Sequence, residues 1–210
     1  MATTERNAFF GLPECHIALM TNEATFAYAE PVDVGSLGGI IEIALDSDSS
    51  NDVLYASDQP WIDSEVDNGF TGTIRFAGVW THPTLRTLFA EITGYDFADD
   101  GTLLGTSGKP RKKFALMSGQ SGNIVGKRTC YLSTQLTAKP SRNAATKEAS
   151  GVHQADEFPV AARVVKLPTG WKGSFYENIE GDSTYATFFD AVRNDLEPRT
   201  ENSGNDGGNG

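Results

Sequence analysis

Three carboxylates at alternate positions, Asp63, Glu65 and Asp67, are the residues whose type and spacing best suit catalysis. In an extended strand, residues two apart lie about 7 Å apart at Cα and point to one side. Paired carboxylates hydrolyse glycosidic bonds, one as acid and the other as nucleophile or base. The acid needs an apolar pocket that raises its pKa, whereas three acids in a row indicate a wet, charged surface. A β-sandwich glycosidase or carbohydrate-binding module is therefore the less favoured interpretation.

Other motifs in the sequence also argue against catalysis, cofactors and metals. Residues 122–129 are not a phosphate-binding loop, because Arg128 stands where a hydroxyl residue would hold magnesium. Residues 46–57 begin like a calcium loop but have Asn51 and Ser57 in place of the glycine and glutamate that such a loop needs. The three histidines are isolated in sequence from one another and from the cysteines. We expect no catalytic residue, cofactor or metal ion.

The two cysteines and the distribution of apolar residues indicate whether the protein is secreted or spans a membrane. Cys15 and Cys130 lie far apart among apolar and β-branched neighbours, which indicates two buried thiols rather than a disulfide. No window approaches 18 consecutive apolar residues, and Glu5, Arg6 and Pro13 interrupt the apolar stretch that a signal peptide needs. We expect neither a membrane span nor a secretion signal.

The charge of the chain is acidic overall and unevenly distributed. The 210 residues contain 17 Lys and Arg against 28 Asp and Glu, a formal net charge of −11, so a sequence-reading nucleic-acid-binding protein is not expected. Residues 1–95 hold 14 acids and three bases, residues 96–150 hold four acids and nine bases, and residues 151–210 hold ten acids and five bases. An acidic part and a basic part of one chain favour association between copies.

Hydrophobic periodicity predicts a mainly β fold with two peripheral helices, in two packed antiparallel sheets. We expect an N-terminal arm (1–12), a single domain (13–196) and a disordered tail (197–210). Apolar stripes with helix signals predict helices over 83–94 and 182–196, and a polar stretch predicts a flexible loop over 138–157. The remaining predicted strands are 14–20, 26–34, 111–118, 124–137 and 158–167.

Residues 38–77 predict a long antiparallel hairpin whose strands each have one wet face. Ile41, Ile43 and Leu45 alternate with polar residues, and the segment 61–77 keeps one alternation throughout. Gly69 and Gly72 allow a bend or a bulge. We expect residues 51–60 to form an extended connection between the strands.

The order of these segments resembles a known family over nearly all of residues 7–196. The segments that carry the resemblance are Phe10–Pro13, Ile17–Met20, Tyr28–Pro31, Gly39–Leu45, Leu54–Pro60, Gly69–Arg75, Pro83–Asp96 and Thr187–Ala191. The turn at Leu54–Asp58 between two alternating strands is the strongest of them. Taken in order, the chain resembles the major tail protein, or tail tube protein, of long-tailed bacteriophages.

The resemblance implies a structural virion protein that assembles with itself. Six subunits would close into a ring whose inner strands form a barrel, and stacked rings would form the tail tube through which DNA leaves the virion. The implied partners are further copies, the tape-measure protein and the tail-terminator protein, and DNA would pass without specific binding. The implied location is the phage tail, assembled in the host cytoplasm. A head–tail joining or capsid-decorating phage protein is the alternative within the same class.

Two sets of residues acquire roles from this resemblance. Acidic side chains on the wet faces would line the lumen, where repulsion keeps DNA from adhering to the wall. The lumen candidates are Glu42, Asp46, Asp63, Glu65 and Asp67, and Arg75, of the same parity, would pair with a carboxylate or mark where the strand leaves the lumen. The candidates for contacts between subunits or rings are Leu54, Tyr55, Trp61, Lys139, Arg142 and Lys147.

Overall fold

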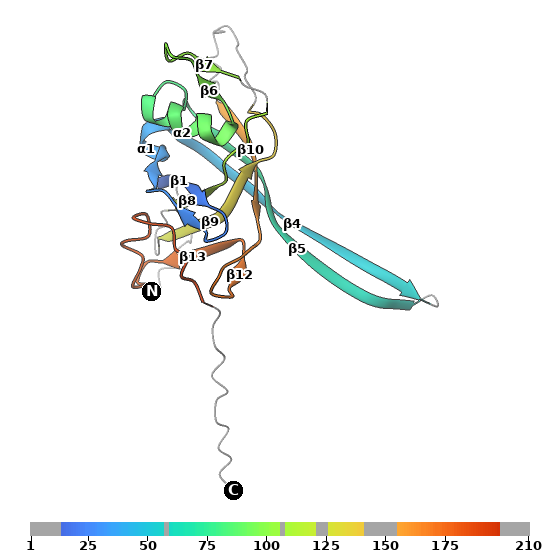
Figure 1. The fold of residues 1–210 in the computed structure, drawn as a ribbon. Coiled ribbons are helices and arrows are strands. Elements are labelled where there is room, and N and C mark those ends of the chain that lie inside the picture. Colours follow the sequence, from blue (N-terminus) through green and yellow to red (C-terminus); the bar gives the residue numbers. More distant parts are fainter. Residues whose placement is uncertain (1–13, 57–58, 106–107, 121–125, 141–154, 198–210) are drawn as a thin grey trace, which may run out of the picture.

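The computed structural model describes residues 14–56, 59–105, 108–120, 126–140 and 155–197. These residues form one nine-stranded antiparallel sheet, two small two-stranded sheets and two helices (Figure 1), which confirms the mainly β prediction. The predicted arm 1–12, most of the predicted loop 138–157 and all but Glu197 of the predicted tail lie outside the described residues. No helix in the described ranges is long and apolar enough to cross a membrane.

The main sheet is a single open path rather than two separate sheets. Its strands are β1 (Glu14–Asn22), β2 (Ala27–Tyr28), β3 (Val32–Asp33), β4 (Ile40–Ala56), β5 (Gln59–Phe76), β8 (Phe114–Gln120), β9 (Lys127–Leu136), β10 (Asp156–Arg163) and β13 (Phe175–Ile179). Their order is β2-β1-β8-β9-β10-β5-β4, with β3 on β1 and β13 on β9. The small sheets pair β6 (Asp96–Phe97) with β7 (Leu103–Leu104) and β11 (Val165–Lys166) with β12 (Lys172–Gly173).

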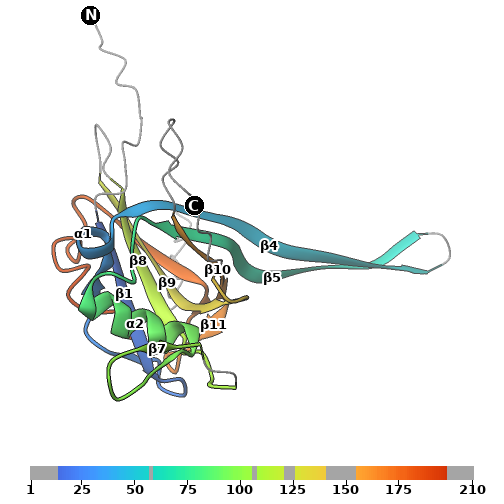
Figure 2. The same ribbon diagram turned by 90° about the horizontal axis from the view of Figure 1, so that it is seen from above.

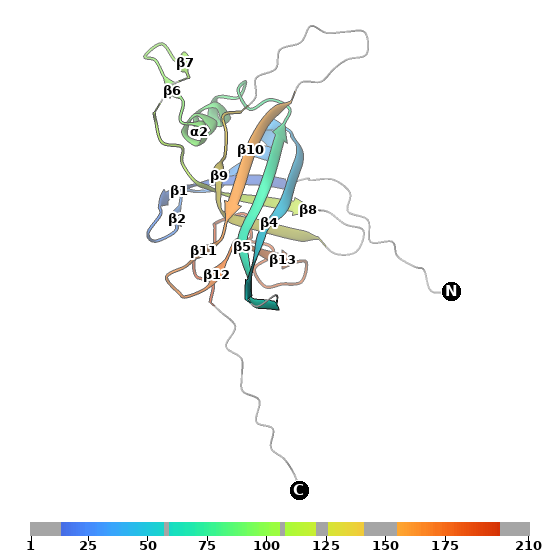
Figure 3. The ribbon, with the colours of Figure 1, turned by 90° about the vertical axis from the view of Figure 1, so that its right-hand side faces the viewer.

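The sheet folds over itself like a sandwich. Figure 3 shows β1 and β8 running across the direction of β10, β5 and β4. The first hydrophobic core includes Phe114 and Leu116 of β8, Ile74 and Phe76 of β5 and Phe158 of β10, and all five are at most 1% exposed. The two packed layers of the prediction are therefore two parts of one continuous sheet.

Helix α2 (Pro83–Thr93) covers this core, as the spacing of apolar residues predicts. Leu85, Phe89 and Ile92 on its inner face are buried, and Phe89 packs on Phe158 with ring centroids 4.8 Å apart. Proline begins the helix, and Gly94 ends it with a φ of +73°, where its N–H donates to the Ala90 carbonyl.

The second predicted helix, 182–196, is wrong: the segment is a run of turns. Its backbone forms hydrogen bonds between residues three apart, as in turns: the Tyr185 N–H donates to the Asp182 carbonyl (3.0 Å) and the Phe188 N–H to the Tyr185 carbonyl (3.3 Å). The Asp182 carboxylate accepts from the Ile179 N–H, so it competes with helix formation at this end. The other helix is instead α1 (Val34–Gly38), capped by the Asp33 carboxylate, which accepts from the Ser36 N–H.

The turns over 182–196 cover the other face of the sheet. Phe188 is 4% exposed in a second core with Met117 of β8 and Leu132 of β9, and Phe189, Val192 and Leu196 pack against it. Strand β8 is thus buried on both faces, with Phe114 and Leu116 in the first core and Ala115 and Met117 in the second. The apolar spacing over 182–196 correctly predicts a buried stripe but not its backbone conformation.

The two cysteines are free and fully buried, one in each core, which confirms the predicted thiols. Burial raises the pKa of the Cys130 thiol to about 12 and also raises that of Cys15. Because the thiolate is the reactive form, neither thiol is expected to react with dithionitrobenzoate in native protein at pH 8, and two equivalents are expected in 8 M urea. Rapid release of one equivalent from native protein would contradict this placement.

An aromatic and charged cluster fastens the 182–196 segment to β1 and β9. The Arg128 guanidinium lies 4.1 Å from the Tyr185 ring centroid and 4.7 Å from that of Phe189, and it contacts Glu14 at 3.1 Å. It also donates to the Tyr185 carbonyl. His16 also stacks against Phe189, with ring centroids 4.4 Å apart.

The stacked His16 is expected to make stability depend on pH. Burial lowers its pKa below the ordinary 6.5, with a smaller contribution from Arg128, although Asp33 and Glu14 oppose this. The unfolded chain then binds a proton before the folded chain does, so this contribution is complete above pH 6.5 and is lost as the pH falls below it. Urea unfolding from pH 7.5 to 5 should show wild type losing stability relative to His16→Phe, which keeps the stacking. Parallel pH profiles would contradict the assignment.

Candidate functional site

Strands β4 and β5 continue as a two-stranded ribbon that projects from the body (Figures 1 and 2). Strand β10 pairs with β5 only over Phe70–Phe76, and beyond this point β4 is the one strand of the described chain that pairs with β5. We call residues 49–56 and 59–67 the arm; at about 3.3 Å per residue it is about 25 Å long. The long hairpin is thus confirmed.

The predicted connection over 51–60 is wrong, because β4 runs to Ala56 and β5 begins at Gln59. Leu54 pairs with Ile62 and Tyr55 with Pro60, with a register shift between the two pairs, so the residues expected in a loop form the distal part of the arm. Their types explain this outcome: valine, leucine, tyrosine, tryptophan and isoleucine gather on both sides of the turn and favour strands.

The arm and the base of the hairpin leave long strand edges without partners. Strand β4 ends the sheet, and in the described chain the outer edge of its 17 residues pairs with no strand. The outer edge of β5 is equally free beyond Phe70. Such edges template pairing with other chains unless charged side chains discourage it. Residues 40–74 hold eight acids and no Lys or Arg, so only a partner with a suitable charge is expected to pair here.

A bulge on β5 marks the base of the arm. Ser47 pairs with Phe70 and Ser49 with Asp67, so β5 has one residue more than β4 between these pairs. Gly69 takes up the extra residue with a φ of +95°, and its N–H donates to the Asp67 carboxylate at 2.8 Å. A second register shift, between Ile40 and Glu42, turns Ile41 outward to 49% exposure, while Ile43 and Leu45 pack on the core as predicted.

The bulge divides the predicted lumen candidates between two faces. Directly paired residues share a face, so Glu42 lies with Arg75, and Asp46 with Thr71. Asp67, paired with Ser49, lies on the opposite face, which Phe70 also occupies. The expectation that alternation keeps one phase through the whole of 61–77 is therefore wrong. Asp63 and Glu65 pair in register with Val53 and Asn51, in the stretch whose side chains the structure does not describe.

The outer face of β4, β5 and β10 is exposed and partly ion-paired. Arg75 bridges Glu42 (3.2 Å) and Glu157 (3.1 Å), which confirms the predicted pairing of Arg75 with a carboxylate. Arg163 contacts Asp48 at 3.0 Å. Asp46 is exposed and has no ion-pair partner in the described part of the chain. Because Asp46 is unpaired among the described residues, this face keeps an acidic character. Exposed ion pairs contribute at most about 1 kcal/mol each, so the pairs on this face add little stability.

The predicted contact residues are spread over the molecule. Leu54 and Tyr55 lie in β4 and Trp61 in β5, all near the distal end of the arm. Lys139 is exposed beyond the end of β9. Arg142 and Lys147 lie outside the described residues.

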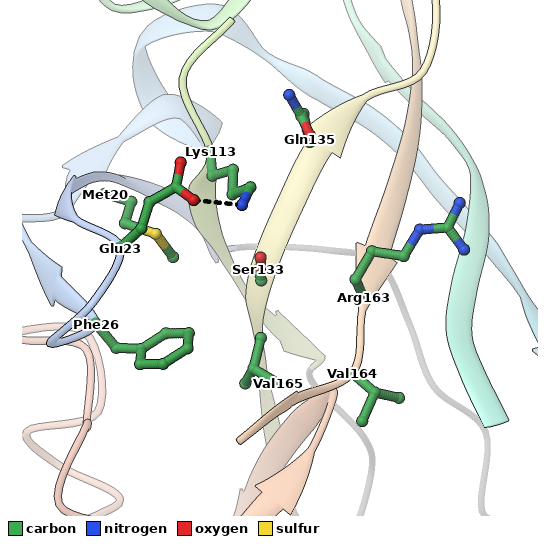
Figure 4. A pocket seen from close by; sticks show the side chains of 9 residues that line it. All are labelled: Met20, Glu23, Phe26, Lys113, Ser133, Gln135, Arg163, Val164 and Val165. Carbon is green, nitrogen blue, oxygen red and sulfur yellow. Dashed lines mark hydrogen bonds and ion pairs between the residues drawn. The ribbon is translucent and has the colours of Figure 1, made fainter. Parts of the chain in front are cut away.

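A hollow of about 270 Å³ near the end of β1 provides a test of the glycosidase alternative (Figure 4). Its only acidic lining residue is Glu23, which is held by Lys113 at 2.6 Å. A glycosidase needs two carboxylates at its cleft, and Asp67, the described member of the predicted trio, is exposed on the β5 ribbon and does not line the hollow. The hollow therefore lends no support to glycoside hydrolysis.

Two lysines that the sequence analysis did not single out face one another on a small ribbon. Lys166 of β11 pairs in register with Lys172 of β12, and both are exposed. Pro168 and Gly170 are the signal in the sequence, because they favour a tight turn that brings the residues flanking it together.

Neither metal chemistry nor similarity to known proteins assigns a function to these surfaces. In the described ranges, no three or more His, Cys, Asp or Glu side chains gather in a way that would hold a metal ion. No protein-family model matches the sequence, and no curated protein matches it either.

Proposed function

We propose that the chain is a structural subunit that polymerises into a hollow tube of the phage tail type, the conduit for DNA during ejection. The observation that carries the proposal is the arm: a two-stranded ribbon that leaves the body and, among the described residues, has no strand partner beyond Phe70. A lone two-stranded ribbon is at best marginally stable in water, so it requires cover from another chain.

The edges of the sheet support closure into a ring. The free 17-residue edge of β4 offers backbone donors and acceptors to a neighbouring copy, while the opposite end of the sheet is covered by the short strands β2 and β3. Strand pairing around a ring removes such edges altogether. In this assembly β4 and β5 would contribute to the inner barrel, with six copies in each ring, as the resemblance implies.

The distribution of charge supports a conduit for DNA. Glu42 and Asp46 share the exposed outer face of the hairpin base, so these two remain lumen candidates on one face. A wall of acids repels phosphates and lets the duplex slide without adhering. The tape-measure and tail-terminator proteins would be the further partners, and the virion the location.

The proposal is tested by electron microscopy of the concentrated, purified protein. We expect hollow filaments of constant diameter in negative stain and a sedimentation boundary that grows with concentration. Closed rings that never stack would favour a head–tail joining or capsid-decorating protein instead. A monomer that persists across concentration and salt would overturn the proposal.

A further inference from the structure

The ribbon β11–β12 presents two like charges side by side. Lys166 and Lys172 are directly paired in register, so their side chains leave the same face of the ribbon. Like charges at such positions repel one another unless an anionic group lies between them. Neither lysine has an ion-pair partner in the described residues, so both charges are available to an acidic group from outside this part of the chain.

Several other bases of the body differ from these two because they are paired internally. Lys112 contacts Glu91 at 2.7 Å, and Lys127 contacts Glu177 at 2.7 Å. Lys109 contacts Asp96 at 3.3 Å. The basic surface left for an acidic partner therefore includes the β11–β12 ribbon, whereas these lysines already have acids beside them.

The two lysines are held on a firm support. Leu167, next to Lys166, is 2% exposed, and its N–H donates to the Trp171 carbonyl at 2.8 Å. Trp171, next to Lys172, packs on the second core. Because the turn between the lysines is anchored at both sides, binding an acid there costs little ordering of the backbone.

We propose that the β11–β12 ribbon is the docking surface for the acidic arm of a second copy of this chain. The proposal rests on the proposed tube and names the contact that would join its subunits. The arm itself contains four acids, Asp52, Asp63, Glu65 and Asp67, and no Lys or Arg, which complements the paired lysines. Figure 1 shows the arm leading away from its own body, so its distal part is available to another copy rather than to its own β11–β12.

A charge-reversal cycle tests the contact. Lys166→Glu with Lys172→Glu, and separately Asp63→Lys with Glu65→Lys, should each raise the protein concentration needed for assembly at least about tenfold. The two changes together should restore assembly, because the reversed surfaces attract again. The matched control is Lys109→Glu with Lys112→Glu, which alters the net charge equally elsewhere and should leave the assembly concentration within about twofold. Circular dichroism melting shows that each variant folds.

The outcomes separate this inference from the proposed function. If wild type forms tubes and the Lys166 and Lys172 variant assembles equally well, the docking surface is overturned but the tube is not. The same holds if the combined variant is folded but does not recover assembly. Absence of wild-type assembly would overturn both. Binding of duplex DNA by the monomer through these lysines, with assembly unaffected by their reversal, would assign the ribbon to nucleic acid and would also overturn the inference.

Discussion

Replacing residues 50–66 by a two-residue Asn-Gly turn is expected to abolish assembly completely while leaving the body folded. The replacement joins Ser49 to Asp67, the last pair before the bulge, and Asn-Gly suits a tight hairpin turn. The body keeps its stability because β10 pairs with β5 only from Phe70 onward and both hydrophobic cores lie outside the arm. Sedimentation velocity should give a monomer at every concentration, with an unchanged thermal unfolding midpoint.

The matched control keeps both strands of the arm and changes only the two residues that link them in the sequence. Ser57 and Asp58 replaced by Asn-Gly introduce the same two residues at full arm length, and this variant should assemble like wild type. If the shortened chain still forms tubes, the arm is not the element that joins subunits, and its lack of a strand partner in the described part of the chain has another explanation. Loss of assembly in both variants would point to the turn rather than to the ribbon.

Local signals in the sequence predict the elements whose stability is local. Helix α2 has proline at its start, glycine at its end and an apolar stripe that reaches the core, so its bounds agree with prediction to within one residue. The hairpin likewise follows from alternation on both strands. These predictions succeed because the signals that define each element, its capping residues and its apolar spacing, lie within the element itself.

Predictions that depend on distant contacts fail more often. The spacing of Tyr185, Phe188, Phe189 and Val192 suits a helix, yet Arg128 and the second core hold these residues on a run of turns. Nothing near Tyr185 in the sequence indicates that Arg128 of β9 will lie over the rings of Tyr185 and Phe189. An aromatic stripe alone therefore cannot separate a helix from turns that are pinned to a sheet.

The single added residue at the bulge shows why the candidate site was only half predictable. Counting parity along 61–77 treats the strand as regular, and one inserted residue moves every later side chain to the other face. The sequence offers two glycines, Gly69 and Gly72, as places for an irregularity. Only the register with β4 shows that the bulge is at Gly69 and that Asp67 and Arg75 lie on opposite faces of the hairpin.

Alanine at Gly69 is accordingly expected to destabilise the protein by about 3 kcal/mol. Two costs combine. The φ of +95° strains any residue with a Cβ, and that Cβ would overlap the backbone carbonyl oxygen of Ala162 on β10. Relief requires β5 and β10 to separate, or the bulge to shift and reverse the faces of the arm. Urea unfolding followed by tryptophan fluorescence measures the loss.

Gly101→Ala provides the matched control, because it isolates the backbone strain. Gly101 has a φ of +82°, but an added Cβ there meets no atom within 4 Å, so this variant should lose only about 1 kcal/mol. The difference between the two variants measures the close approach of β5 to β10 beneath the bulge. Equal losses would show that β10 yields freely to the added methyl group, and the bulge would then not fix the direction in which the arm leaves the body. A larger loss at Gly69 accompanied by failed assembly would tie the geometry of this one residue to polymerisation, since Gly69 itself lies on the body side of the arm.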